Sequence, residues 1–156
     1  MKARAGVQRL TVYNHFPDDA ALFPACSAHF LERHPFPDPS PAFAEAEPVD
    51  RVRKGLELLY PWFRETEQMT GNIRRDRALV PALDDFCSQT IDVRFGQLTD
   101  GLAAGFSARG ARARRVHALI AVAVDFWTWK RLDQEGLGDR AAARLMAETV
   151  ASAATT

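Results

Sequence analysis

Apolar residues recur three or four positions apart through most of the chain, and no stretch alternates strictly between apolar and polar residues. This period places apolar side chains on one face of an α-helix, whereas a half-buried strand requires alternation. Val52, Leu56, Leu59 and Phe63 follow the helical period, with Pro61 among them as an expected kink. We therefore expect an all-α protein.

Further helices are expected on both sides of this segment. The apolar period, together with the residues that start or end helices, predicts them over residues 9–16, 19–33, 73–80, 81–104, 112–135 and 139–153. Pro17 and Asp18 supply a break and an N-cap between the first two. Gly136, Gly138 and Asp139 end one helix and start the last.

Prolines mark the clearest boundary in the chain. Residues 34–41 hold Pro35, Pro37, Pro39 and Pro41, four of the nine prolines, so we expect no helix to run through them. The backbone there must be extended or turning. The sequence thus divides into residues 1–34, a Pro-rich linker at 35–48 and a larger helical domain at 49–156.

The overall composition is that of an ordinary globular protein. Hydrophobic residues make up 47% of the chain and the formal net charge is +0, so any attraction to nucleic acid must be local. The one local excess of positive charge lies at the start, where Lys2, Arg4 and Arg9 precede the first carboxylate, Asp18. The first segment is therefore basic.

The cysteines and the apolar runs bear on the compartment. Cys26 and Cys87 have no motif spacing and the chain starts without the pattern of a signal peptide, which predicts reduced thiols in a cytoplasmic protein. The longest apolar run, residues 118–124, is far shorter than a membrane span. We expect no contact with a membrane.

The last two predicted helices carry more apolar surface than one small bundle needs. Apolar side chains surround most of the helix at 112–135. The stripe on the final helix is made largely of small side chains, namely Ala142, Leu145, Met146, Thr149, Val150 and Ala153. A four-helix contact with a second copy would cover this surface, as is usual in homodimers. The alternative is that it packs against the rest of the same chain.

Residues 5–17, Ala-Gly-Val-Gln-Arg-Leu-Thr-Val-Tyr-Asn-His-Phe-Pro, closely resemble the second half of a TetR-family helix-turn-helix. Residues 117–129, followed by Gly138 and Asp139, are similar to the regulatory domain of the same family. The resemblance implies a remnant of a helix-turn-helix in residues 1–34, followed by an α-helical effector-binding and dimerisation bundle in residues 49–156. It also implies a transcriptional regulator, expected to be a repressor, that is controlled by a small molecule.

The same resemblance implies which residues contact DNA. A helix over residues 9–16 places Val12 and Phe16 on one face, which leaves the other face free to enter the major groove. The family's pattern carries over to Arg9, Leu10, Tyr13 and Asn14 for bases or adjoining backbone, to Thr11, Tyr13 and His15 for phosphates, and to Gln8 at the position of the helix cap. We expect these residues to bind an operator.

Two departures from the family separate two hypotheses. Asp18 and Asp19 stand where the family commonly has a phosphate-binding lysine, and only residues 1–5 stand where it has a first helix and most of a second. Because isolated helices shorter than about 12–15 residues are marginal, we expect residues 9–16 of this chain to be frayed or repacked. One hypothesis is a regulator whose gene product extends upstream of Met1. The alternative is a ligand-binding and dimerisation module that does not bind DNA by itself.

Aromatic residues on the long central helices are candidates for an effector site. The expected lining consists of Trp62, Phe63, Phe86, Phe95, Phe126 and Trp129, with His117 and Asp125 as polar groups. Such a cavity would take an apolar or aromatic effector. The alternative is that these aromatics form an ordinary core.

Catalysis and metal binding are not expected. His29 and His34 lie five positions apart, a spacing that does not place two metal ligands on one helical face. No nucleophile motif and no glycine-rich phosphate loop is present in the sequence. We predict that the protein is not an enzyme and needs neither a metal nor a cofactor.

Overall fold

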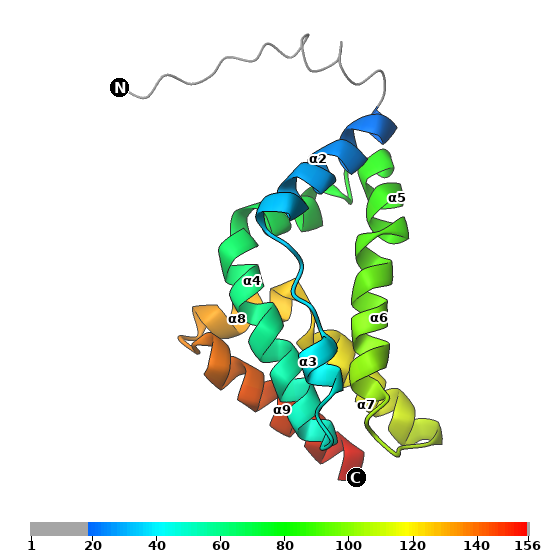
Figure 1. Cartoon of the computed structure of the whole chain (residues 1–156), viewed down its shortest axis with the longest axis vertical. Helices are drawn as coiled ribbons and strands as arrows, with labels where there is room; N and C mark the ends of the chain where they lie inside the picture. The colour runs from blue at the N-terminus through cyan, green and yellow to red at the C-terminus, as the bar shows by residue number, and fades with distance from the viewer. Residues whose placement is uncertain (1–18, 156) are drawn as a thin grey trace.

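The structure, a computed structural model, describes residues 19–155, and all regular secondary structure in this range is helical (Figure 1). The helices are α2 (Asp19–Arg33), α3 (Ser40–Phe43), α4 (Pro48–Asp76), α5 (Pro81–Gln89), α6 (Ile91–Ala103), α7 (Gly110–Ala123), α8 (Phe126–Gln134) and α9 (Asp139–Thr155). The prediction of an all-α class is confirmed for the described residues. The helix expected over residues 9–16, with the break at Pro17 and Asp18, lies outside them.

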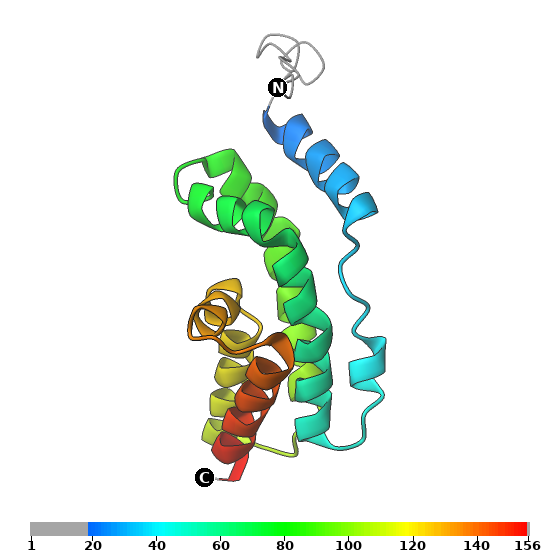
Figure 2. The ribbon, with the colours of Figure 1, turned by 90° about the vertical axis from the view of Figure 1, so that its left-hand side faces the viewer.

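Four helices enclose the core. α9 packs against α4 and α7, and α6 packs against the same two helices, so α4, α6, α7 and α9 form a closed bundle. Figure 2 shows α7, α8 and α9 on one side of α4, and α2, the Pro-rich linker and α3 on the other. α3 packs against α4 and α6, while α2 packs chiefly against α5. The chain thus runs along one side of the bundle before it enters it.

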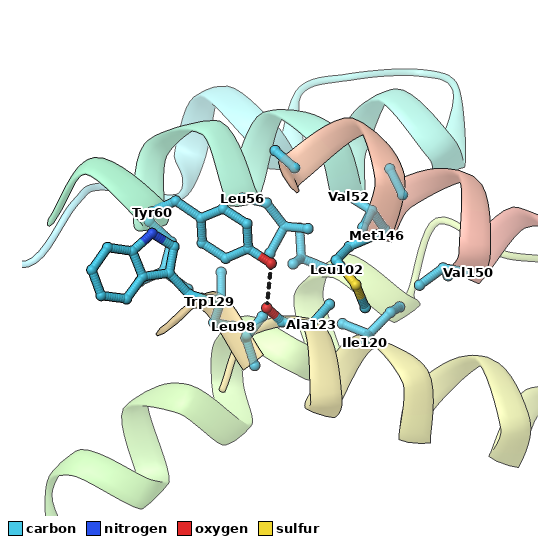
Figure 3. Close-up of a cluster of buried hydrophobic side chains, with 14 of the residues drawn as sticks. Val52, Leu56, Tyr60, Leu98, Leu102, Ile120, Ala123, Trp129, Met146 and Val150 are labelled. Carbon is cyan, nitrogen blue, oxygen red and sulfur yellow. Dashed lines mark hydrogen bonds between the residues drawn. The ribbon is translucent and has the colours of Figure 1, made fainter. Parts of the chain in front are cut away.

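The core contains side chains from every helix of this bundle (Figure 3). Leu56, Leu102, Ile120 and Val150 come from α4, α6, α7 and α9 and are all fully buried. Burial of a side chain of this size contributes roughly 1.5–3 kcal/mol to folding. The bundle is therefore held together chiefly by apolar contacts.

The buried stripe of α9 differs in part from the predicted one. Ala142, Met146 and Val150 are buried as expected, whereas Leu145 and Thr149 are exposed. Ala143 and Ala147 are buried in their place. The three buried alanines and Val150 have small side chains, and this lets α9 lie close to both α4 and α7. The buried face is thus displaced around the helix axis, away from Leu145 and Thr149 and towards Ala143 and Ala147.

α4 is longer than the sequence pattern predicted. It continues through Pro61 to Asp76, so the start of the segment predicted separately at 73–80 belongs to it. Pro61 itself is exposed, and because proline has no N–H, the backbone carbonyl four residues earlier lacks its usual donor within the helix. Residues 77–79 form a turn before α5.

Two predicted helices are each divided in the structure. The segment at 81–104 breaks at Thr90, whose backbone has φ −125° and ψ −68° and whose hydroxyl donates to the carbonyl of Phe86 at 2.6 Å. The segment at 112–135 breaks at Asp125, whose carboxylate accepts a hydrogen bond from the backbone N–H of Trp127 at 2.9 Å. Asp125 is therefore the N-cap of α8.

The Pro-rich linker is ordered against the bundle. Residues 35–39 have no regular secondary structure, as expected, but α3 begins inside the proline run, because Pro41 lies in its first turn. Phe36 packs edge-on against Trp62 and Phe95, with ring centroids 5.2 and 5.5 Å apart. The linker thus forms part of the wall beside α4 and α6. None of the helices described has the length and apolar character needed to cross a membrane.

Candidate ligand cavity

A cavity of about 350 Å³ lies between α2, α4, α5 and α6. Its walls are mainly apolar and come from Leu22, Phe23, Phe30, Leu31, Phe36, Trp62, Met69, Ile73, Leu83, Phe86, Ile91 and Phe95. Cys26, Ser27, Thr70, Asn72, Arg74, Asp76, Cys87, Thr90 and Arg94 supply sulfur and polar groups. An apolar hollow with a few polar groups is the usual form of a small-molecule site.

Aromatic rings form two parts of the wall. Phe36, Trp62 and Phe95 are in mutual contact through Phe36, as described for the linker. Phe23 of α2 and Phe86 of α5 meet with centroids 6.3 Å apart. The ring faces and edges exposed to the cavity suit an apolar or aromatic molecule.

The C-terminal end of α2 is fastened to α4. The indole N–H of Trp62 donates to the backbone carbonyl of His34 at 3.1 Å. The ring nitrogen Nδ1 of His34 lies 2.6 Å from a carboxylate oxygen of Glu65. These two contacts fix the point where the chain leaves α2 and turns along the bundle.

Near the C-terminal end of α4, a charged network at the capping residue Arg77 joins this helix to α5 and α6. Its guanidinium contacts Asp84 of α5 at 2.7 Å and the two carboxylate oxygens of Asp92 of α6 at 2.8 and 2.9 Å. Hydrogen bonds from Arg77 hold the pKa of Asp92 below its usual value, although partial burial opposes the shift. Breaking this network would free the end of α4 from α5 and α6.

Two cations line the cavity in contact with its rings. The Cζ atom of Arg74 lies 5.3 Å from the ring centroid of Phe95, and that of Arg94 lies 5.3 Å from the centroid of Phe36. Arg94 is exposed and also borders a second, open depression of about 500 Å³ along the linker. Burial raises the pKa of the Cys87 thiol, which keeps it protonated in the wall.

Three of the predicted site residues line this cavity, namely Trp62, Phe86 and Phe95. Phe63, Phe126 and Trp129 are instead buried in the core, where their rings pack against one another at 5.5–5.8 Å. Phe63 stacks on the back of Phe95, with centroids 6.0 Å apart and planes inclined by 4°. These three aromatics support the wall without reaching the cavity.

The two predicted polar groups lie elsewhere. His117 is exposed on α7, and its Nε2 atom lies 2.9 Å from a carboxylate oxygen of Asp100. Asp125 caps α8, as described above. Neither residue borders the cavity, because the outward face of α7 and the start of α8 lie on the other side of the bundle.

Sequence reasoning missed the contribution of α2 and of Phe36. Leu22, Cys26 and Phe30 lie four positions apart, a helical stripe that was visible in the sequence. The resemblance places this stripe in the DNA-binding part of the chain, and the sequence contains no signal that α2 also borders a cavity. Arg74 and Arg94 also line the cavity, and no motif in the sequence distinguishes them from the other arginines.

The residues expected to contact DNA, namely Gln8, Arg9, Leu10, Thr11, Tyr13, Asn14 and His15, lie outside the described residues. No family model, curated protein or solved structure matches the chain. Within residues 19–155, no group of three or more His, Cys, Asp or Glu side chains is placed to hold a metal ion. The function proposed for the cavity therefore depends on its own side chains and on the sequence of the segment before α2.

Proposed function

We propose that the protein is a TetR-like transcriptional regulator whose cavity binds an apolar or aromatic small molecule. One observation carries the proposal. α2 follows directly after the TetR-like residues 5–17, and it also supplies Leu22, Phe23 and Phe30 to the cavity wall. A molecule in the cavity would therefore touch the helix that continues from the DNA-reading segment.

The cavity is suited to this role by size and chemistry. Its volume of about 350 Å³ lies within the range of roughly 300–1,000 Å³ that is typical of small-molecule sites. The side chains that surround it are mainly aliphatic and aromatic. Burial of a ligand's apolar surface there would supply most of the binding free energy.

The attachment of α2 supports a mechanism for control. Trp62 and Glu65 hold the chain at His34, at the end of α2 that is remote from the DNA-reading segment. At the other end, α2 meets α5 through Phe23 and Phe86. A ligand that enters between α2 and α5 would favour a different angle of α2 about His34. The ligand could shift the balance between two positions of α2, and so the free energy of DNA binding, by no more than the difference between its own binding free energies for those two positions.

A second copy of the chain is part of the proposal, because a two-headed regulator reads two half-sites. α7 and α9, which pack against each other, keep apolar side chains on their outer surfaces, with Val122 49% and Leu145 42% exposed. Trp127 at the start of α8 is 52% exposed. Contact between two copies through these helices would cover these side chains.

Ligand binding is tested with N-phenyl-1-naphthylamine, a neutral dye whose fluorescence rises in apolar surroundings. The wild-type chain should bind the dye, and Ser27→Phe, which fills the cavity from α2, should weaken binding by about tenfold or more. Ala28→Phe is the matched control, since Ala28 is the next residue on α2 and is exposed. Equal binding by both variants would contradict the proposed site.

DNA binding is tested by selecting genomic fragments with the full chain and titrating the complexes with salt in gel shifts. A specific complex that weakens as salt rises, and that Arg9→Ala weakens, supports the regulator. Addition of a cavity ligand should change the affinity. Dye binding without DNA binding would instead support the ligand-binding and dimerisation module, and absence of both would overturn the proposal.

A further inference from the structure

We infer that the ligand of this cavity is an apolar monocarboxylate, whose body lies against the aromatic wall and whose carboxylate pairs with Arg74 and Arg94. The inference rests on the small-molecule site proposed above and adds the chemical class of its ligand. It is carried by the placement of two cations at an otherwise apolar cavity.

The two arginines are built into the aromatic wall. Arg74 of α4 is half-buried over Phe95, and Arg94 of α6 is exposed over Phe36, each at 5.3 Å from the ring centroid. Phe36 and Phe95 themselves form an edge-to-face pair 5.5 Å apart. The cations thus lie next to the rings that an apolar ligand would contact.

Neither guanidinium is hydrogen-bonded or ion-paired to a carboxylate in the described part of the chain, although the pKa of Asp92 is lowered by the hydrogen bonds from Arg77 and, to a smaller extent, by the charge of Arg74. The nearby Arg77, in contrast, contacts both Asp84 and Asp92. Asp76, the one carboxylate that borders the cavity, is bound by the adjacent Arg75 at 2.7 and 3.1 Å.

The contact with a ring engages the charge of a guanidinium but leaves its N–H groups free to donate. A carboxylate is the complementary acceptor, because its two oxygens match the planar fork of donors. The cavity therefore offers two sets of donors, each of which suits a carboxylate.

Charge decides among ligands with the same apolar body. A carboxylate that leaves water for an apolar cavity must meet opposite charge, which Arg74 and Arg94 supply. A neutral alcohol gains only the burial of its chain, and an ammonium group would be repelled. Arg74 should matter more than Arg94, because it is half-buried and less screened by solvent.

Size limits the ligand as well. A water molecule occupies about 30 Å³ in the liquid, so the cavity of about 350 Å³ has room for a body on the order of a dozen non-hydrogen atoms. Decanoate is of this size, and decan-1-ol and decylamine share its chain with a neutral and a cationic head.

The first test is calorimetric titration of the wild-type chain with these three compounds at neutral pH. Decanoate should bind about tenfold to a hundredfold more tightly than decan-1-ol, and decylamine most weakly, as charge-assisted hydrogen bonds require. Decan-1-ol binding as tightly as decanoate would overturn the inference. If the neutral dye still binds, the proposed cavity stands while the carboxylate class falls; if nothing binds, both fall.

The second test uses variants. Arg74→Met should remove most of the preference for decanoate over decan-1-ol, Arg94→Met a smaller part, and Arg112→Met, an exposed arginine on α7, none of it. A variant of Arg74 that weakens both compounds equally would mark a structural role and contradict the inference. Should Arg74→Met not fold, Arg74→Lys keeps the charge without the planar fork and should retain an intermediate preference.

Discussion

The hydroxyl of Tyr60 on α4 donates a 2.8 Å hydrogen bond to the backbone carbonyl oxygen of Ala123, the last residue of α7 (Figure 3). The last carbonyls of a helix have no N–H partner within it, and Ala123 is fully buried. Burial raises the pKa of Tyr60, so its hydroxyl stays protonated and remains a donor. One side chain thus closes the end of α7 and joins it to α4.

Replacing Tyr60 by Phe should lower the free energy of unfolding by about 1–2 kcal/mol, because the carbonyl of Ala123 would stay buried without this donor. Urea unfolding followed by circular dichroism measures the loss. Thr149→Val is a suitable control, since Thr149 is exposed on α9, and its effect should stay within about 0.5 kcal/mol. A Tyr60 variant as stable as the wild type would show that the bond contributes nothing net.

Gly101 and Gly96 of α6 should respond oppositely to alanine. A Cβ atom at Gly101 would lie 2.3 Å from Cζ of Phe43, whereas one at Gly96 would have no neighbour within 4 Å. We expect Gly101→Ala to cost about 1–3 kcal/mol by displacing α3, and Gly96→Ala to stabilise α6 by up to about 1 kcal/mol. Thermal unfolding of both variants is the measurement. If Gly101→Ala is as stable as the wild type, Phe43 must be able to move away from the new Cβ atom without cost. Adding Phe43→Leu to Gly101→Ala should then not raise stability further.

The fold class and several helix boundaries could be predicted from the sequence because they depend on local signals. α2 has the predicted bounds, Asp19–Arg33, and α9 begins at Asp139 after two glycines. The breaks at Thr90 and Asp125 were missed, since the apolar period runs through both positions. Asp125 was interpreted as a polar group of a ligand site, although its position before an apolar run is also typical of an N-cap.

The cavity could be predicted only in part, because its lining depends on how helices distant in sequence meet. Trp62 and Phe63 are neighbours on α4, yet Trp62 borders the cavity and Phe63 lies in the core. Periodicity identifies both as apolar but does not say which face meets the core. Phe36 reaches the cavity only because the linker runs back along α4 and α6, a path that no local pattern contains.

The free energy of unfolding should depend on pH through the carboxylate of Asp139. Arg64 contacts its carboxylate at 2.8 and 3.1 Å and Trp129 donates to it at 3.1 Å, and these hydrogen bonds, from Arg64 above all, hold its pKa below the usual value. A depressed pKa stabilises the fold at pH values above the unfolded value, near 3.9, and this stabilisation is lost as the pH falls through the lower folded value.

We therefore expect Asp139→Asn to unfold more easily than the wild type at pH 6, and the difference to shrink by on the order of 1 kcal/mol towards pH 2. Urea unfolding across this pH range gives the measurement. Asp85→Asn, on an exposed aspartate of α5 whose side chain makes no hydrogen bond among the described residues, serves as the control for the substitution itself. A difference for Asp139→Asn that does not change with pH would contradict the role assigned to Arg64.

The association of two copies can be tested by placing charge on the outer surfaces of α7 and α9. Val122→Glu and Leu145→Glu would each put a carboxylate into the proposed contact, where burial without a partner is costly. Val93→Glu on α6 is the matched control, because Val93 and Val122 are both 49% exposed. Sedimentation velocity should find twice the chain mass of 17.3 kDa for the wild type and the control, and the single mass for the other two variants.

If Val93→Glu alone dissociates the dimer, the contact lies on α6. A wild type that stays monomeric at all concentrations would remove the paired reading heads from the proposed mechanism, because α2 of one copy would then have no second head to move against.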